Sequence, residues 1–164
     1  TEIVEIHNGE IFRSQSLSMG SLNVFHQYVS KILPKEKEIH NMEQHIQKML
    51  EKSALPEQKS NRLYGIGGTA RAAMRIINDY YGKNRETNVF TCCQLYEITE
   101  ILTSKNKQAK KLMIRNCPDR IHTMIPGILI MKALCEATCK EDIYISKYGV
   151  REGYLCHKVL KNTI

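Results

Sequence analysis

The sequence predicts a mixed α/β fold, in which helices pack on a sheet that has both antiparallel and parallel strands. Three observations favour this class. An Asn8-Gly9 pair separates two short apolar segments, a strand-to-helix transition surrounds Gly67-Gly68, and residues 128–137 are nearly all apolar. The first observation predicts a hairpin, the second a strand–helix unit, and the third a helix buried between layers.

The hairpin comes first, with strands expected at residues 3–7 and 11–17. Asn-Gly is the preferred centre of a type I′ turn, because both central residues of that turn need positive φ. Gly20 marks a bend, and Ser21 is expected to cap a helix that reaches residue 33. Apolar residues at helical spacing then predict an amphipathic helix over residues 35–52, followed by a polar loop at 53–61.

A short strand over residues 63–66 leads into a helix over 69–81. Its expected buried stripe consists of Ala70, Ala73, Met74 and Ile77, whose small early members allow close packing on a sheet. Gly82 is expected to end this helix in the left-handed conformation.

The remaining chain is mainly helical. Thr91 and Gln94 form a capping-box pattern for a helix that ends near residue 102, and a basic helix follows at 104–116. Pro118 opens a long helical region, which Pro126-Gly127 is expected to interrupt before the apolar helix at 128–137. A strand at 142–146 and a final helix at 151–160 complete the prediction.

Composition is that of an ordinary globular domain. The chain has 164 residues, 42% hydrophobic and 25% charged, with no apolar run long enough to span a membrane and no visible signal peptide. The net charge of +7 favours polyanionic ligands, although 7% aromatic content offers few stacking platforms for nucleic acid. The first residues already have a strand pattern without an initiating Met, which suggests a domain of a longer protein.

Six cysteines are present, and they form no C-x-x-C pair. Cys135 and Cys139 are four residues apart, but His122 and His157 are the only loosely placed candidates for further metal ligands. Buried, reduced thiols in a cytoplasmic protein are therefore expected, with no metal site and no disulfides.

The most informative segment is residues 64–71, where two glycines precede a helix. Glycine allows a ligand to approach the backbone closely, and the first turn of a helix offers unpaired N–H groups and a positive dipole end. These are the requirements for holding phosphate, so Gly67, Gly68, Thr69 and Arg71 are candidate phosphate-binding residues. An ordinary strand–helix turn without a ligand, with Arg71 in a structural ion pair, is the alternative.

Three phrases together resemble the exopolyphosphatase and guanosine pentaphosphate phosphohydrolase (Ppx/GppA) family. They are Gly-Ile-Gly-Gly-Thr-Ala-Arg at 65–71, Asp119-Arg120 leading into Ile-Pro-Gly-Ile-Leu-Ile at 125–130, and Ser-Lys-Tyr-Gly-Val-Arg-Glu-Gly at 146–153. Their order and spacing match, and the resemblance covers essentially the whole chain. The opening Thr1-Glu2 matches the residues that directly follow a glycine-rich phosphate loop in that family.

The resemblance implies one domain, residues 1–164, that is the second lobe of a ribonuclease-H-like, actin-like fold. The first lobe, with the family's principal catalytic glutamate, and the glycine-rich loop are absent from this sequence. The implied activity of the full-length protein is release of terminal phosphate from inorganic polyphosphate or pppGpp, usually with Mg²⁺. Glu2 is then a candidate catalytic residue that orients water or a hydrated metal ion, and Arg120 a candidate nucleotide-binding residue.

Partners implied by this resemblance are polyphosphate or guanosine penta- or tetraphosphate and the missing lobe, with a homodimer left open and no membrane or nucleic acid expected. Two departures bear on substrate preference: Arg120-Ile121-His122 replaces a more acidic phrase, and Lys147 replaces an acidic or small residue. The fragment alone is expected to be inactive. The alternatives are a non-catalytic module that binds (p)ppGpp or polyphosphate, and general polyanion binding by the lysine-rich segment 105–115.

Overall fold

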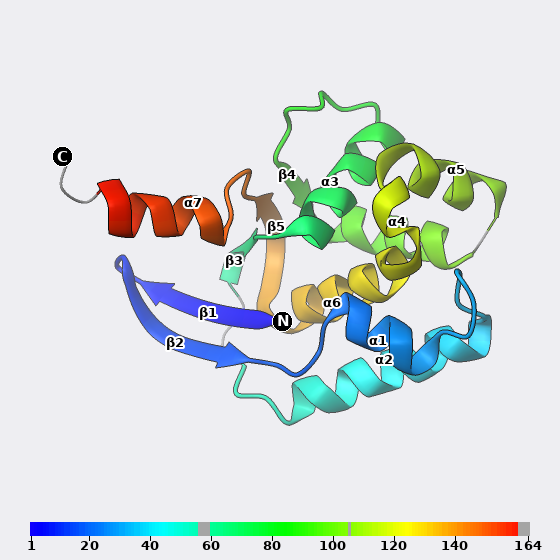
Figure 1. The fold of residues 1–164 in the computed structure, drawn as a ribbon, viewed down its shortest axis with the longest axis horizontal. Coiled ribbons are helices and arrows are strands. Elements are labelled where there is room, and N and C mark those ends of the chain that lie inside the picture. Colours follow the sequence, from blue (N-terminus) through cyan, green and yellow to red (C-terminus); the bar gives the residue numbers. More distant parts are fainter. Residues whose placement is uncertain (56–59, 105, 161–164) are drawn as a thin grey trace.

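The computed structural model describes residues 1–55, 60–104 and 106–160. Strands β1 (Glu2–His7) and β2 (Glu10–Ser16) form the predicted antiparallel hairpin. Both central residues of its turn have positive φ, 52° at Asn8 and 83° at Gly9, as the Asn-Gly pattern requires. The hairpin is a separate two-stranded sheet, and in Figure 1 it lies beside the helical body.

The second sheet is mixed and has three strands in the order β3-β5-β4. Strand β3 (Ser60–Gly65) runs parallel to β5 (Cys139–Ile145), and β4 (Val89–Thr91) is antiparallel to β5. The mixed sheet is confirmed, but β4 was not predicted, because it has only three residues. Because β3 and β5 are parallel neighbours, their carboxyl ends meet at one edge, and Ser146 N–H donates to Gly65 O there at 3.0 Å.

Helices cover this sheet and fill most of the molecule (Figure 1). They are α1 (Ser21–Tyr28), α2 (Glu36–Glu51), α3 (Gly68–Tyr80), α4 (Cys92–Thr103), α5 (Lys107–Asn116), α6 (Ile121–Thr138) and α7 (Val150–Tyr154), with a 3₁₀ turn at Pro118–Arg120 and a π-helical turn at Leu155–Val159. Among the described residues, none of the helices combines the length and the apolar composition that crossing a membrane requires.

Two expectations about helix ends are wrong. The first helix stops at Tyr28 rather than near residue 33, and Gly20, not Ser21, is its N-cap residue. The predicted loop at 53–61 lies partly outside the described residues, which also exclude Lys105. In contrast, Thr91 and Gln94 form the predicted capping box of α4, and Gly82 has the predicted left-handed φ of 62°.

Pro126-Gly127 does not interrupt α6, which is continuous from Ile121 to Thr138. Proline removes one backbone donor but keeps a helical φ, so a helix that is packed on several sides can retain it. Gly127 has a different role: a Cβ placed there would lie 2.5 Å from Thr69 Cγ2 and 3.3 Å from Ser21 Cβ. The glycine is therefore needed for close packing of α6 against α3 and α1.

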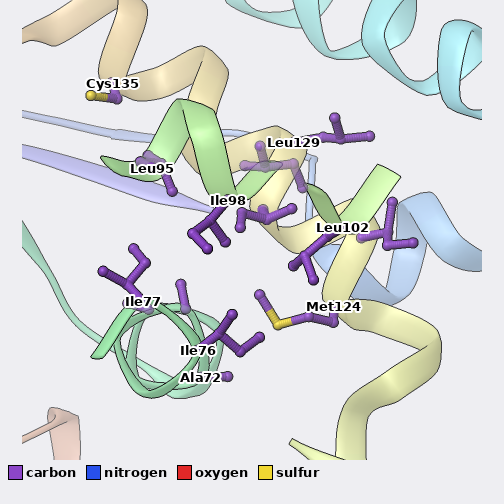
Figure 2. Packing of buried hydrophobic residues seen from close by; sticks show 14 of the residues in the cluster. Ala72, Ile76, Ile77, Leu95, Ile98, Leu102, Met124, Leu129 and Cys135 are labelled. Atoms are coloured by element: carbon purple, nitrogen blue, oxygen red, sulfur yellow. The ribbon is translucent and has the colours of Figure 1, made fainter. Parts of the chain in front are cut away.

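The core is organised around α6, which packs against helices α1 to α5. Figure 2 shows Met124 and Leu129 of α6 facing Leu95, Ile98 and Leu102 of α4 and Ile76 and Ile77 of α3. The predicted stripe of α3 is buried at all four positions, Ala70, Ala73, Met74 and Ile77. This packing holds the amino-terminal end of α3 against the amino-terminal half of α6.

Candidate functional site

The candidate site is the turn between β3 and α3, at the carboxyl edge of the mixed sheet. Gly65 ends β3 where a Cβ would meet Ile145 Cδ1 at 2.8 Å and Ala70 Cβ at 3.2 Å, so the strand, the helix and β5 pack closely. Gly67 has φ of 117°, a conformation that L side chains rarely adopt, and the space beside it is open. The backbone thus bends sharply at Gly67 and starts α3 at Gly68.

The amino-terminal end of α3 has no side-chain cap and no acidic residue in its first turn. The first intrahelical bond runs from Arg71 N–H to Gly67 O at 3.1 Å. The N–H groups of Gly68, Thr69 and Ala70 precede this bond and are the free donors of the helix end. Together with the positive end of the helix dipole, they make a place where an anion is favoured.

Arg120 adds a cation to this end of α3. A Cβ placed on Gly68 would lie 2.5 Å from Arg120 Nη1 and 2.9 Å from Nη2, so the guanidinium lies directly against the Gly68 backbone. Arg120 Nε is paired with Asp119 Oδ2 at 3.1 Å, and the Arg120 side chain is 33% exposed. The structure therefore brings together two predictions that are about fifty residues apart in the sequence, the glycine turn and Arg120.

Thr69 is half-buried, and its side chain lies against Gly127 of α6. Ser21, at the start of α1, approaches the same position on Gly127. Because the Thr69 side chain packs against Gly127, the group that Thr69 offers at the amino-terminal end of α3 is its backbone N–H. Gly127 packs against Thr69 and Ser21 packs against Gly127, so both support the site, but neither was predicted as a site residue. A small residue inside an otherwise apolar helix is the signal that could have indicated Gly127.

Arg71 lies near the loop that follows β5. Glu152 accepts a hydrogen bond from Gly149 N–H at 2.7 Å, which lowers the pKa of the Glu152 carboxyl, and the charge of Arg71 lowers this pKa further. Arg71 is half-buried and forms no ion pair within the described part of the chain. It therefore contributes positive charge to the same edge of the sheet.

Glu2 is exposed at the start of β1, opposite Ser16. Among the described residues it forms no hydrogen bond or ion pair with the glycine turn. The first residue is linked to the site indirectly, because Leu17 N–H donates to Thr1 O at 2.7 Å and the chain then continues to Ser21 at the start of α1. Of the predicted site residues, the structure gathers Gly67, Gly68, Thr69 and Arg120, with Arg71 one turn further along α3.

Two other surface features do not join this site. On α5, Lys107, Lys110 and Lys111 are exposed, and Arg115 pairs with Asp79 at 3.1 Å. A hollow between α2 and α6, lined by residues that include His40, Gln44 and Lys132, contains none of the predicted site residues.

This combination defines the class of the protein: a mixed α/β fold of the actin-like kind, with a glycine turn, the uncapped start of α3 and Arg120 at the carboxyl edge of its sheet. Residues 1–162 match the model of the Ppx/GppA phosphatase family, and the chain belongs to that family. No curated protein matches the sequence.

Solved structures agree with this assignment of the fold. A Ppx/GppA family member from Aquifex aeolicus is 22% identical, with a TM-score of 0.80 over 99% of this chain and 54% of its own. An exopolyphosphatase from Cytophaga hutchinsonii is 16% identical, with a TM-score of 0.74 over 94% of this chain and 52% of its own. The chain thus spans about half the length of these structures.

Proposed function

We propose that this chain is the second lobe of a phosphoanhydride hydrolase that releases terminal phosphate from inorganic polyphosphate or pppGpp. The observation that carries the proposal is the Arg120 guanidinium against the uncapped amino-terminal end of α3. The family match and the similarity to an exopolyphosphatase from Cytophaga hutchinsonii support the same substrate class.

The proposed task of the turn is to hold phosphate oxygens. Phosphoryl transfer needs little covalent chemistry from the protein, so positioning and charge neutralisation provide most of the catalysis. The N–H groups at Gly68 and Thr69 would donate to one phosphate, while Arg120 offers a charged fork that can leave Asp119 for a phosphate oxygen. Arg71 would add charge for the next phosphate of an extended substrate.

Glu2 is proposed to orient the attacking water, and Mg²⁺ is proposed as the cofactor of the full-length enzyme. Among the described residues, no group of three carboxylates converges. One carboxylate from this lobe nevertheless fits Mg²⁺, because that ion commonly keeps several waters and binds through one or two carboxylates plus substrate phosphates. When bound, it would neutralise charge on the phosphates.

The lobe alone is proposed to be inactive, because the proposed active-site cleft lies between two lobes and needs residues from both. Large apolar side chains are exposed on the hairpin (Val4, Ile6, Ile11, Phe12) and on the last helical segment (Val150, Tyr154, Leu155, Val159). Exposed apolar surface of this extent is typical of an interaction surface, and we propose that the other lobe covers part of it. We place the protein in the cytoplasm, where its six free thiols would stay reduced.

The test is hydrolysis of polyphosphate and of pppGpp by the full-length protein, each with and without Mg²⁺. Arg120→Ala is expected to lower kcat/KM by tenfold or more, and Arg115→Ala is the matched control, since Arg115 is an exposed arginine away from the turn. Binding of either substrate without any turnover would favour the second candidate, a non-catalytic module for (p)ppGpp or polyphosphate. Wild-type rates for Arg120→Ala would contradict the assigned site.

A further inference from the structure

Three buried cysteines from two distant parts of the chain meet at the amino end of β5. Cys92 is the first residue of α4, Cys135 lies in the last turns of α6, and Cys139 begins β5. Their three Sγ atoms all lie within 4.8 Å of one another, and no residue of the three is more than 4% exposed. The glycine turn is at the opposite, carboxyl end of the sheet, so this cluster is separate from the phosphate site.

The arrangement approaches that of a thiolate metal site. Zinc–sulfur bonds of about 2.3 Å place tetrahedral sulfur ligands about 3.8 Å apart, so the three sulfurs need to close by roughly 1 Å at most. Tyr96 lies one helical turn after Cys92, and its hydroxyl is 3.7 Å from Cys135 Sγ. Tyr96 is half-buried, so a fourth ligand, its hydroxyl or a water molecule, has access from that side.

Simple packing does not require this convergence. A thiol is a weak donor that behaves as a small apolar group, and a branched aliphatic side chain fills such space as well. Among the described residues, this is the one group of three cysteines, histidines or carboxylates with ligand atoms at metal-binding separation. The sequence spacing indicated only Cys135 and Cys139 as neighbours, and the structure adds Cys92 as a third potential ligand.

We propose that Cys92, Cys135 and Cys139 bind Zn²⁺. Thiolates select soft ions such as Zn²⁺ and Cu⁺ over Mg²⁺ or Ca²⁺. Three thiolates around Zn²⁺ leave one net negative charge, whereas Cu⁺ would leave two, and buried net charge is unfavourable. On binding, three Zn–S bonds form and each thiol proton passes to solvent. The ion joins α4, α6 and β5, so its role is structural and independent of phosphate hydrolysis.

The experiment uses reduced full-length protein, first stripped of metal by a chelator. Added Zn²⁺ is expected to bind at one ion per chain, measured by elemental analysis after gel filtration, and to raise the Tm. Added Co²⁺ is expected to give the thiolate-to-cobalt charge-transfer absorption. Cys92→Ser should weaken Zn²⁺ binding by more than about a hundredfold, beyond the effect typical of losing an outer hydrogen-bond partner.

Two matched controls separate this site from general thiol binding. Cys93→Ser changes an exposed neighbour, and Cys117→Ser changes a buried cysteine outside the cluster; both should keep Zn²⁺ binding. The Co²⁺ spectrum of the unmutated protein tests the proposal even if a cluster variant fails to fold. Absence of the charge-transfer band and of any Tm change with excess Zn²⁺ would overturn it. So would a disulfide between two of the three cysteines in freshly isolated protein, which would indicate a redox pair.

Discussion

At the scale of single residues, glycine is required at three positions of the site for three different physical reasons. Gly67 supplies a left-handed φ beside open space, Gly68 leaves room for the Arg120 guanidinium, and Gly127 leaves room for Thr69. A side chain added at Gly67 would therefore strain the backbone, whereas one added at Gly68 would meet Arg120 and one added at Gly127 would meet Thr69. Substitution of Gly68 should mainly affect ligand binding, because the flexible Arg120 side chain can move aside. Substitution of Gly127 should mainly affect stability, because the short Thr69 side chain cannot.

Gly68→Ala should weaken polyphosphate binding by about tenfold or more, because the new methyl group displaces Arg120 from the helix end, a loss like that of one charge-assisted contact. The Tm should change little, since the long arginine side chain can move aside. Isothermal calorimetry and thermal unfolding measure the two effects. Gly153→Ala is the control, because a Cβ there meets nothing within 4 Å; equal binding by both variants would contradict the role of Gly68.

Gly127→Ala should instead lower the free energy of unfolding by about 1–3 kcal/mol, the range typical of overpacking. The added methyl collides with Thr69 Cγ2. Thr69→Ser removes that methyl, so the double variant should recover part of the loss in urea unfolding. Additive effects of the two substitutions would show that the collision is not the cause.

At the scale of elements, capping decides where α4 begins. The Thr91 hydroxyl accepts from Gln94 N–H at 3.2 Å, and the Gln94 side chain accepts from Thr91 N–H at 3.2 Å. The cap also fixes the position of Cys92, the first residue of the helix, and follows directly on β4. The Thr91–Gln94 cap therefore sets the start of α4, which places Cys92 in the cysteine cluster.

Thr91→Ala should lower the free energy of unfolding by about 1 kcal/mol, the usual effect of losing an N-cap side chain. Thr103→Ala, at the other end of α4, is the control. Its hydroxyl donates to the Thr99 carbonyl, an interaction that adds little to helix stability. Chemical unfolding of both variants measures the difference, and an equal loss in the two would rule out capping as the cause.

At the scale of the whole molecule, the hairpin and the mixed sheet are separate sheets, with exposed apolar side chains on the hairpin and the last helical segment. The exposed apolar surface is accounted for by the proposal that a second lobe packs beside this chain. This chain covers 54% and 52% of two similar proteins of known structure, so those proteins are long enough to contain a second lobe. The cleft between two such lobes is then the expected place for an extended, highly charged phosphate chain.

The isolated lobe should show no measurable phosphatase activity, and co-expression with the other lobe should restore it. Phe12→Asp places a charge on the exposed apolar hairpin surface and should weaken that association by at least about tenfold, since it buries an unpaired charge. Lys110→Asp, on α5, is a charge-changing control away from that surface. Robust turnover by the isolated lobe would contradict the two-lobe proposal.

The sequence by itself determined the local features: the Asn8-Gly9 turn, the Thr91–Gln94 cap, the buried stripe of α3 and the strand-to-helix turn at Gly67-Gly68. Each depends on neighbouring residues, whose backbone preferences and spacing are readable in order. Only the tertiary structure decided that Arg120 lies against Gly68, that α6 continues through Pro126, and that Cys92 meets Cys135 and Cys139. Those contacts join residues far apart in the chain, and they result from the packing of α6 against its neighbours, which local preference does not determine.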